Sequence, residues 1–480
     1  MASSHWRRKW EQDAETDGWS PVPTQIVSNE EYLPLPPTPE QRRVAHHLRE
    51  ASRLQAARLD MSRRKFLASP CGMAAAFLAM NQVFGRFFDV DPAEASETAA
   101  VAERLPRGEF VFDVQTHHVA PGRQFAGTMQ RRETARRLDP LLQGRGPVRK
   151  EELLLANYIK EVFLDSDTSV AVISGVPSQT EAYNILPPEQ MAATREIVNR
   201  LAASRRVVAH GLIAPNRHGD NLEMQWQVQK LRIEAWKGYT GQPMGGARQQ
   251  WAVDDERVAY PMLELSRRLG VRNICLHKGF PFPGTGVEAW HPRDIEKAAR
   301  DFPDLNFIVY HAGLKDIGQA ARADLSRRDA RVDWVTDLCE IRQRNPTLTN
   351  IFAELGSTFG MTAITSPRLC GHILGMLIQS LGADHVLWGT DSIWWGSPQW
   401  QIEAFRRFEM PESLMTTFGY APLTPDVKAR IFGLNAAGVF GVDPGAVLNQ
   451  VPQDYISRLR AAYLEDGPRP SLTQYGWVLG

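Results

Sequence analysis

Histidine and aspartate side chains recur near the ends of short apolar segments in this sequence. His117 follows the first such segment, His277 and His311 follow two later ones, and Asp391 follows the last. Imidazole nitrogens and carboxylate oxygens bind zinc-like ions, and both groups transfer protons in enzymes. These four residues are the candidate centre of the protein's chemistry, provided that the fold brings them together.

The apolar segments predict eight β-strands, at residues 109–115, 169–174, 207–213, 231–237, 272–276, 306–310, 350–354 and 385–389. Amphipathic patterns between them predict helices at 188–204, 258–269, 292–301, 331–345 and 367–381. Parallel strands need such crossover connections, so eight units favour an α/β fold of the (β/α)8 TIM-barrel type. An open doubly wound sheet is the alternative, but no GxGxxG motif follows any strand. In a barrel, the catalytic groups lie at the C-terminal ends of the strands, where these histidines and the aspartate fall.

The order of these strand-end residues resembles the amidohydrolase superfamily, and within it the amidohydrolase-related (amidohydrolase 2) branch that includes aromatic-acid decarboxylases. The clearest marks are His311-Ala312-Gly313 and Gly389-Thr390-Asp391-Ser392. The resemblance covers about residues 109–441 and implies a barrel of the metal-dependent hydrolase type.

The resemblance also implies roles for single residues. His117, His277 and Asp391 would hold a divalent ion, zinc in the first place, with Mn²⁺ or Fe²⁺ as alternatives. Asp391 would accept a proton from metal-bound water, and His311 would polarise the substrate carbonyl.

Two residues depart from the ordinary pattern. Gln115 stands where the branch has His or Glu, and its amide oxygen is a weaker ligand for zinc-like ions. Gln115 is therefore a weak ligand, or His118 replaces it, or the site has lost its metal; His118 is disfavoured because adjacent strand residues face opposite ways. Lys237 ends the fourth predicted strand, where it is either a carboxylated metal-bridging lysine or the partner of Glu354 in an ion pair.

Three functions remain open at this stage. The first is a metal-dependent hydrolase acting on a small organic substrate. The second is a metal-dependent lyase, namely a non-oxidative decarboxylase or hydratase of an aromatic or unsaturated carboxylic acid. The third is a non-catalytic barrel that binds a small molecule. Trp394 and Trp395, with Glu354, are candidates for the substrate pocket, although the tryptophans can equally well pack beneath a loop.

Composition excludes several other classes of protein. The 480 residues have zero formal net charge, 43% hydrophobic and 23% charged residues, which excludes collagen, coiled coils and mostly disordered chains. Zero net charge gives no support for nucleic-acid binding. No apolar run reaches the roughly 18 residues of a spanning helix, which argues against a polytopic membrane protein. The four cysteines have no CxxC spacing, so no zinc knuckle or disulfide scaffold is indicated.

The first 95 residues contain a predicted export signal. Residues 1–60 are expected to be disordered, an isolated helix or a non-native extension. Residues 61–95 resemble a twin-arginine signal peptide, with Arg63-Arg64 followed by an apolar stretch at 74–84 and a small-x-small site at 93–95. An ordinary amphipathic helix with a chance Arg pair is the alternative. Translation starting at Met61 would explain the unusually long preamble.

These segments give four predicted regions: 1–60, the signal at 61–95, a barrel at 96–445 and a C-terminal tail at 446–480. The mature protein would be periplasmic or otherwise exported, with the twin-arginine export machinery as a transient partner. The tail would pack on the barrel or on a second copy in a homodimer.

Overall fold

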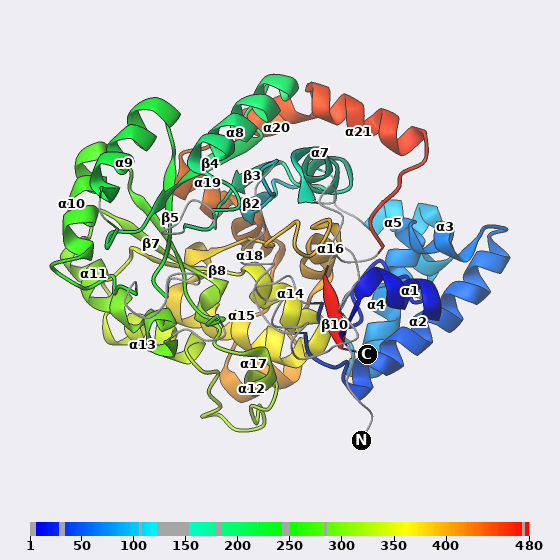
Figure 1. Ribbon diagram of the computed structural model, residues 1–480. Helices are drawn as coiled ribbons and strands as arrows, with labels where there is room; N and C mark the ends of the chain where they lie inside the picture. The colour runs from blue at the N-terminus through cyan, green and yellow to red at the C-terminus, as the bar shows by residue number, and fades with distance from the viewer. Residues whose placement is uncertain are drawn as a thin grey trace.

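The computed structural model describes residues 6–27, 34–104, 108–121, 153–177, 184–217, 219–241, 250–282, 286–472 and 476–479. Figure 1 shows a barrel with helices around it and, on one side, a group of helices from the N-terminus.

Eight parallel strands form the barrel in the order of the sequence, which confirms the predicted α/β fold. A backbone hydrogen bond from Val114 to the Trp388 carbonyl (3.0 Å) and one from Asp391 to the Gln115 carbonyl (2.9 Å) join the first strand to the segment after the last. The strands are β2 (Phe112–Thr116), β3 (Val170–Ile173), β4 (Val207–Ile213), β5 (Ala235–Tyr239), β6 (Asn273–His277), β7 (Asn306–Tyr310), β8 (Ile351–Glu354) and β9 (Val386–Leu387).

Helices connect the strands and cover the outside of the barrel. All five predicted helical patterns contain a helix. The helices from the first strand onward are α7 (Leu155–Ile159), α8 (Pro188–Ala202), α9 (Asp220–Trp226), α10 (Ala259–Leu269), α11 (Ile295–Asp301), α12 (Ile317–Ala320), α13 (Val335–Arg344), α14 (Gly356–Thr365), α15 (Pro367–Leu381), α16 (Gln399–Arg407), α17 (Glu412–Phe418), α18 (Pro425–Ala429), α19 (Asn435–Phe440), α20 (Pro444–Gln450) and α21 (Tyr455–Glu465).

Alternating residues of the strands feed two separate apolar cores. Val170 and Val172 belong to a cluster with Phe440 of α19, whereas Ala171 and Ile173 belong to the larger cluster that includes the helices. Successive strand residues face opposite sides, so the smaller cluster fills the barrel and the larger one fastens the helices to it. Burial on both faces explains why the strands appear in the sequence as short continuous apolar runs.

The fourth strand lies further along the chain than predicted. Residues Gln227–Leu231 continue helix α9 as a π-helical turn, and Arg232 (φ 52°) ends it before β5 begins at Ala235. Lys237 is therefore in the middle of β5 and not at its end.

The N-terminal region differs from the predicted disorder. It contains β1 (Trp6–Arg8), α1 (Lys9–Thr16), α2 (Pro39–Arg58), α3 (Arg63–Leu67), α4 (Pro70–Phe84) and α5 (Thr98–Arg104). Val44, Leu48 and Ala56 of α2 are buried in one core with Ala75, Ala76 and Met80 of α4. These positions on α2 share one helical face, which becomes stable when α4 covers it. The helices stand together beside the barrel in Figure 1.

The two ends of the chain meet. Strand β1 pairs in antiparallel fashion with β10 (Trp477–Leu479), so the C-terminal tail packs against the N-terminal helices as well as the barrel. Among the described residues, no single helix is both long and apolar enough to cross a membrane. One bent pair of helical segments, Pro425–Phe440 and Pro444–Gln453, has the required length and composition when the two are taken together.

Candidate active site

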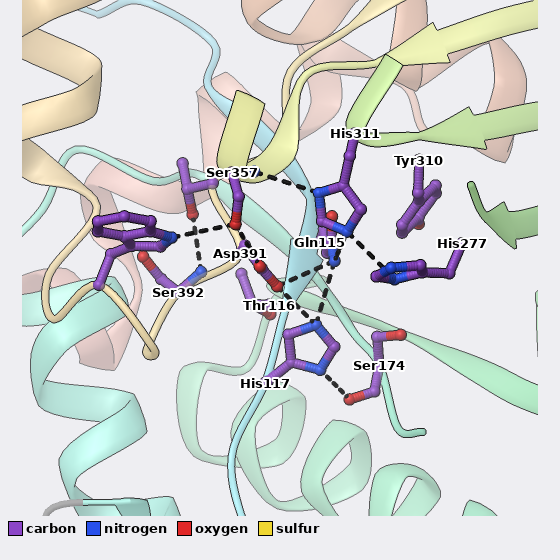
Figure 2. Close-up of polar contacts among 12 residues, drawn as sticks. Gln115, Thr116, His117, Ser174, His277, Tyr310, His311, Ser357, Asp391 and Ser392 are labelled. Carbon is purple, nitrogen blue, oxygen red and sulfur yellow. Dashed lines mark hydrogen bonds and ion pairs between the residues drawn. The ribbon is translucent and has the colours of Figure 1, made fainter. Parts of the chain in front are cut away.

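The structure gathers the predicted site residues at one end of the barrel (Figure 2). Gln115 lies in β2 and His117 follows that strand, whereas His277 ends β6 and His311 follows β7. Asp391 lies in the segment after β9. All five side chains are fully buried.

Gln115 occupies the middle of this group. Its Nε2 lies 2.9 Å from Asp391 Oδ1 and 3.4 Å from Nε2 of both His117 and His311. His117 Nε2 and Asp391 Oδ1 are 3.1 Å apart. The same Nε2 of His311 lies 3.3 Å from His277 Nδ1. The group is therefore a continuous chain of polar contacts from His117 to His277.

Backbone turns at the strand ends aim these side chains inward. His311 and Asp391 both have φ of 61°, a left-handed conformation that is uncommon for residues other than glycine. Gly356 also has positive φ, and a Cβ there would lie 2.7 Å from both Gln115 Oε1 and His311 Nδ1. Glycine at position 356 leaves the room that these two side chains need.

Asp113 ties β2 to the loop that carries Asp391. Its carboxylate accepts hydrogen bonds from the backbone N–H of Gln115 (3.1 Å), from the backbone N–H of Thr390 (3.0 Å) and from the Thr390 hydroxyl. Burial raises the pKa of Asp113 to about 7, against the opposing effect of these hydrogen bonds. Asp113 is thus a positioning residue beneath the site.

Asp391 is held as a carboxylate. Burial alone would raise its pKa, but hydrogen bonding and charge from His117, with the hydrogen bond from the Ser357 hydroxyl, place the pKa of Asp391 below its ordinary value. Ser357 Oγ donates to Asp391 Oδ2 over 2.6 Å, and Trp395 Nε1 donates to Ser357 Oγ over 3.1 Å. An ionised carboxylate in a buried site is a candidate general base.

The neighbours of His311 fix where the protons of two histidines lie. The backbone N–H of Ser357 donates to His311 Nδ1 (3.3 Å), which must be unprotonated. Burial lowers the pKa of His311 to about 3, so the ring is neutral and carries its proton on Nε2. That proton faces His277 Nδ1 over 3.3 Å, which favours the His277 tautomer with its proton on Nε2. Burial holds the pKa of His277 well below its ordinary value.

Aromatic rings surround His277. Its ring stacks on Tyr239 (4.5 Å between centroids, 19° between planes), and Trp290 and Phe282 lie 5.3 Å and 5.7 Å away. His277 Nε2 is buried and has no hydrogen-bond partner among the described residues. A buried N–H without an acceptor is costly, so this atom is the natural contact for a polar group of a ligand.

The remaining predicted site residues are two tryptophans that line the site and two charged side chains, Glu354 and Lys237. Trp394 stacks on His117 (5.6 Å, 23°) and lines the site, as does Trp395. Glu354 accepts from the backbone N–H of His311 (3.0 Å), and burial raises its pKa to about 8. Lys237 lies beneath, with Nζ 3.4 Å from the centroid of the Tyr310 ring, and its charge opposes the effect of burial on the pKa of Glu354. The ion pair with Glu354 and the carboxylation of Lys237 stay predictions.

His118 does not take over from Gln115. Its Nε2 lies 2.7 Å from the Thr194 hydroxyl on α8, on the side away from the site, as the alternation of strand residues predicts.

Sequence reasoning missed Ser357 and Ser174. Ser357 contacts both Asp391 and His311, and the Ser174 carbonyl accepts a hydrogen bond from His117 Nδ1 over 2.7 Å. Both follow barrel strands, β8 and β3, and this position at the catalytic end was the available signal. A serine just after a strand has too many other uses for its type alone to indicate a role.

The sequence pattern of the amidohydrolase family matches residues 178–442, more than half of the chain. The chain belongs to the amidohydrolase family. This identifies it as an enzyme of the amidohydrolase type, and enzymes of this family generally depend on a metal ion. The match begins after β3, so the strand with Gln115 and His117 lies outside it. No curated protein sequence matches the chain.

Solved structures of low sequence identity resemble the chain. An uncharacterized TIM-barrel protein of Bordetella bronchiseptica is 19% identical, with 72% of this chain and 99% of that chain covered and a TM-score of 0.45. 5-Carboxyvanillate decarboxylase from Sphingomonas paucimobilis is 16% identical over 70% and 99% (TM-score 0.41). 4-Oxalomesaconate hydratase from Rhodopseudomonas palustris is 17% identical over 74% and 100% (TM-score 0.40). Similarity at this level says nothing of the reaction catalysed.

A zinc-like ion does not fit the side chains of this amidohydrolase as they are arranged. Such an ion needs three or four protein donors around one point. Among the described residues, no three His, Cys, Asp or Glu side chains are grouped closely enough to hold one. His117 and Asp391 converge, but the amide nitrogen of Gln115 lies between them and His311. The predicted third ligand, His277, presents Nδ1 to His311 instead.

Proposed function

We propose that this amidohydrolase hydrolyses a small carbonyl compound, such as an ester, lactone or amide. The observation that carries the proposal is the pairing of a buried carboxylate, Asp391, with a buried N–H donor, His277 Nε2, in one group of polar contacts. Hydrolysis requires a base for water and a donor for the oxyanion that forms on the carbonyl.

The reaction would run through these two groups. A carboxylate oxygen of Asp391 accepts a proton from water as the water oxygen bonds to the carbonyl carbon. His277 Nε2–H donates a hydrogen bond to the oxyanion. Asp391 then returns the proton to the leaving oxygen or nitrogen as its bond to carbon breaks. The ring of His277 is neutral, because its pKa lies well below the ordinary value. It donates a hydrogen bond to the oxyanion from Nε2 and keeps its proton throughout.

We assign His311 a positioning role in place of the carbonyl-polarising role that the family resemblance implies. Its Nδ1 accepts from Ser357 and its Nε2 faces His277, so it is a positioning residue that fixes the tautomer of His277. The donor to the carbonyl is then His277. Trp394 and the rings around His277 would hold the organic part of the substrate.

A panel of esters, lactones, amides and aromatic carboxylic acids tests the proposal in water enriched in ¹⁸O. Hydrolysis predicts ¹⁸O in the product carboxylate and loss of turnover in Asp391→Asn. Release of CO₂ without ¹⁸O incorporation would instead identify a decarboxylase, and incorporation into a hydroxyl of an intact acid would identify a hydratase.

A further inference from the structure

We infer that the side-chain amide of Gln115 takes the place of the metal ion in this chain. Its Nε2 lies among the three groups that face the centre, at 2.9 Å from Asp391 Oδ1 and 3.4 Å from the Nε2 atoms of His117 and His311. An amide NH₂ has two hydrogens to donate and no lone pair to offer a cation. Those hydrogens reach two acceptors, Asp391 Oδ1 and the unprotonated Nε2 of His117, so the amide holds this pair together as a cation would, without binding one.

His117 has a partner on both ring nitrogens. Its Nδ1 donates to the Ser174 carbonyl (2.7 Å), so only Nε2 faces the centre. As an acceptor, Nε2 faces the amide of Gln115; as a donor, it faces Asp391 Oδ1 at 3.1 Å. Neither protonation state leaves a lone pair of His117 available to a metal.

His277 is turned away from the role of third ligand. Its Nδ1 accepts from His311 Nε2 (3.3 Å), and its Nε2 then carries a proton. A metal would need that nitrogen deprotonated and would need the contact between the two histidines to break.

The orientation of the Gln115 amide decides whether the site repels or binds a metal ion. Its Oε1 lies on the side of Gly356, where the missing Cβ leaves space for it. Turning the amide over would bring Oε1, Asp391 and His117 together as three acceptors, an arrangement that only a cation would stabilise. Replacing Gln115 by Glu makes this change without altering the shape of the side chain.

The inference concerns the same centre as the proposed function, but its test needs no substrate, so the two can fail separately. Wild type, Gln115→Glu and Gln115→His are purified as full chains, incubated with Zn²⁺ or Mn²⁺ and dialysed. Metal per chain is then measured by elemental analysis, and the thermal midpoint is measured with and without each metal. Gln227→Glu is the matched control, because Gln227 is also a buried amide, but its hydrogen bonds go to the backbone of Leu212 in β4.

The wild type is expected to retain well under one ion per chain, with a shift of the midpoint below about 1 °C. Gln115→Glu is expected to retain about one ion per chain and to gain about 5 °C with metal at saturating concentration. Gln115→His gives the same comparison if the glutamate variant does not fold, and Gln227→Glu is expected to gain neither ion nor stability.

Two results would overturn the inference. One is a wild-type chain that retains about one ion, which His117→Ala removes. The other is a set of Gln115 variants that bind no more metal than the wild type does.

Discussion

Glu94 and Arg407 form an ion pair that fastens the N-terminal helices to the barrel. The Glu94 carboxylate accepts from the Arg407 guanidinium over 2.7 Å, with the two side chains 0% and 5% exposed. Nearby, the backbone N–H of Asp89 donates to the Arg407 carbonyl (2.7 Å), and Phe88 meets Phe408. Changing Glu94 to Gln removes the charge at this junction and keeps the volume.

The expected loss of stability in Glu94→Gln depends on the burial of the ion pair and on a second partner of Arg407. Removing one partner of a buried pair typically costs 3–5 kcal/mol, because the other charge remains buried. Arg407 also contacts Glu403 over 3.3 Å, so its charge stays partly compensated. We therefore expect Glu94→Gln to lower the free energy of unfolding by about 2–3 kcal/mol.

The control is Glu50→Gln, which breaks an ion pair of similar length on the surface of α2. Glu50 lies 3.0 Å from Arg53, with both side chains more than half exposed, so the expected cost is below about 0.5 kcal/mol. Urea unfolding of the full chain, followed by tryptophan fluorescence, measures both variants. Equal costs for Glu94→Gln and Glu50→Gln would refute the claim that the N-terminal helices are anchored through this pair.

Three further predictions concern stability, catalysis and export. Burial raises the pKa of Glu354 from 4.5 to about 8, so the folded protein holds a proton that the unfolded chain releases. As the pH rises between these values, the wild type should therefore lose up to about 1.4 kcal/mol of stability per pH unit. Glu354→Gln should flatten this slope in unfolding measured at several pH values, and an unchanged slope would show that Glu354 does not cause it. His277→Phe keeps a flat ring but removes the N–H, and should lower kcat by about 10²–10³ on a substrate found in the panel; a kcat near that of the wild type would exclude His277 as the donor. A reporter fused to residues 61–95 should be exported by the twin-arginine route, and changing Arg63 and Arg64 to Lys should block it; export of the double-lysine form would contradict the predicted signal.

The barrel could be predicted because its strands are buried on both faces. Strands β4 and β7 lie at the predicted residues, and the others differ by a few residues at their ends. Strand β5 was misplaced because the apolar residues of the preceding helical turn, up to Leu231, continue the same pattern. Periodicity alone does not separate short apolar runs of helix and strand.

The sequence allows an isolated helix in residues 1–60 but does not predict its packing, because that packing depends on distant partners. Helix α2 has an ordinary charged surface and only a narrow buried face, including Val44 and Leu48. That face is stable only against α4, whose apolar residues had been read as part of an export signal. Sequence patterns describe single elements, whereas this packing belongs to a pair.

The site could be predicted by residue but not by role. The positions of His117, His277, His311 and Asp391 at strand ends follow from the barrel. Their roles depend on which ring nitrogen meets which partner, and this was fixed by backbone groups of Ser174 and Ser357. The sequence marked Gln115 as unusual, but its place at the centre is visible only once the side chains are in position.

The most direct test of the catalytic centre is a crystal structure with a bound phosphonate that mimics the oxyanion of ester hydrolysis. We expect a phosphonyl oxygen about 2.7–3.1 Å from His277 Nε2, with Asp391 nearby and the Gln115 amide still between Asp391 and His117. A phosphonate bound to a metal ion that His117, His277 and Asp391 coordinate would contradict both the donor role of His277 and the place given to Gln115.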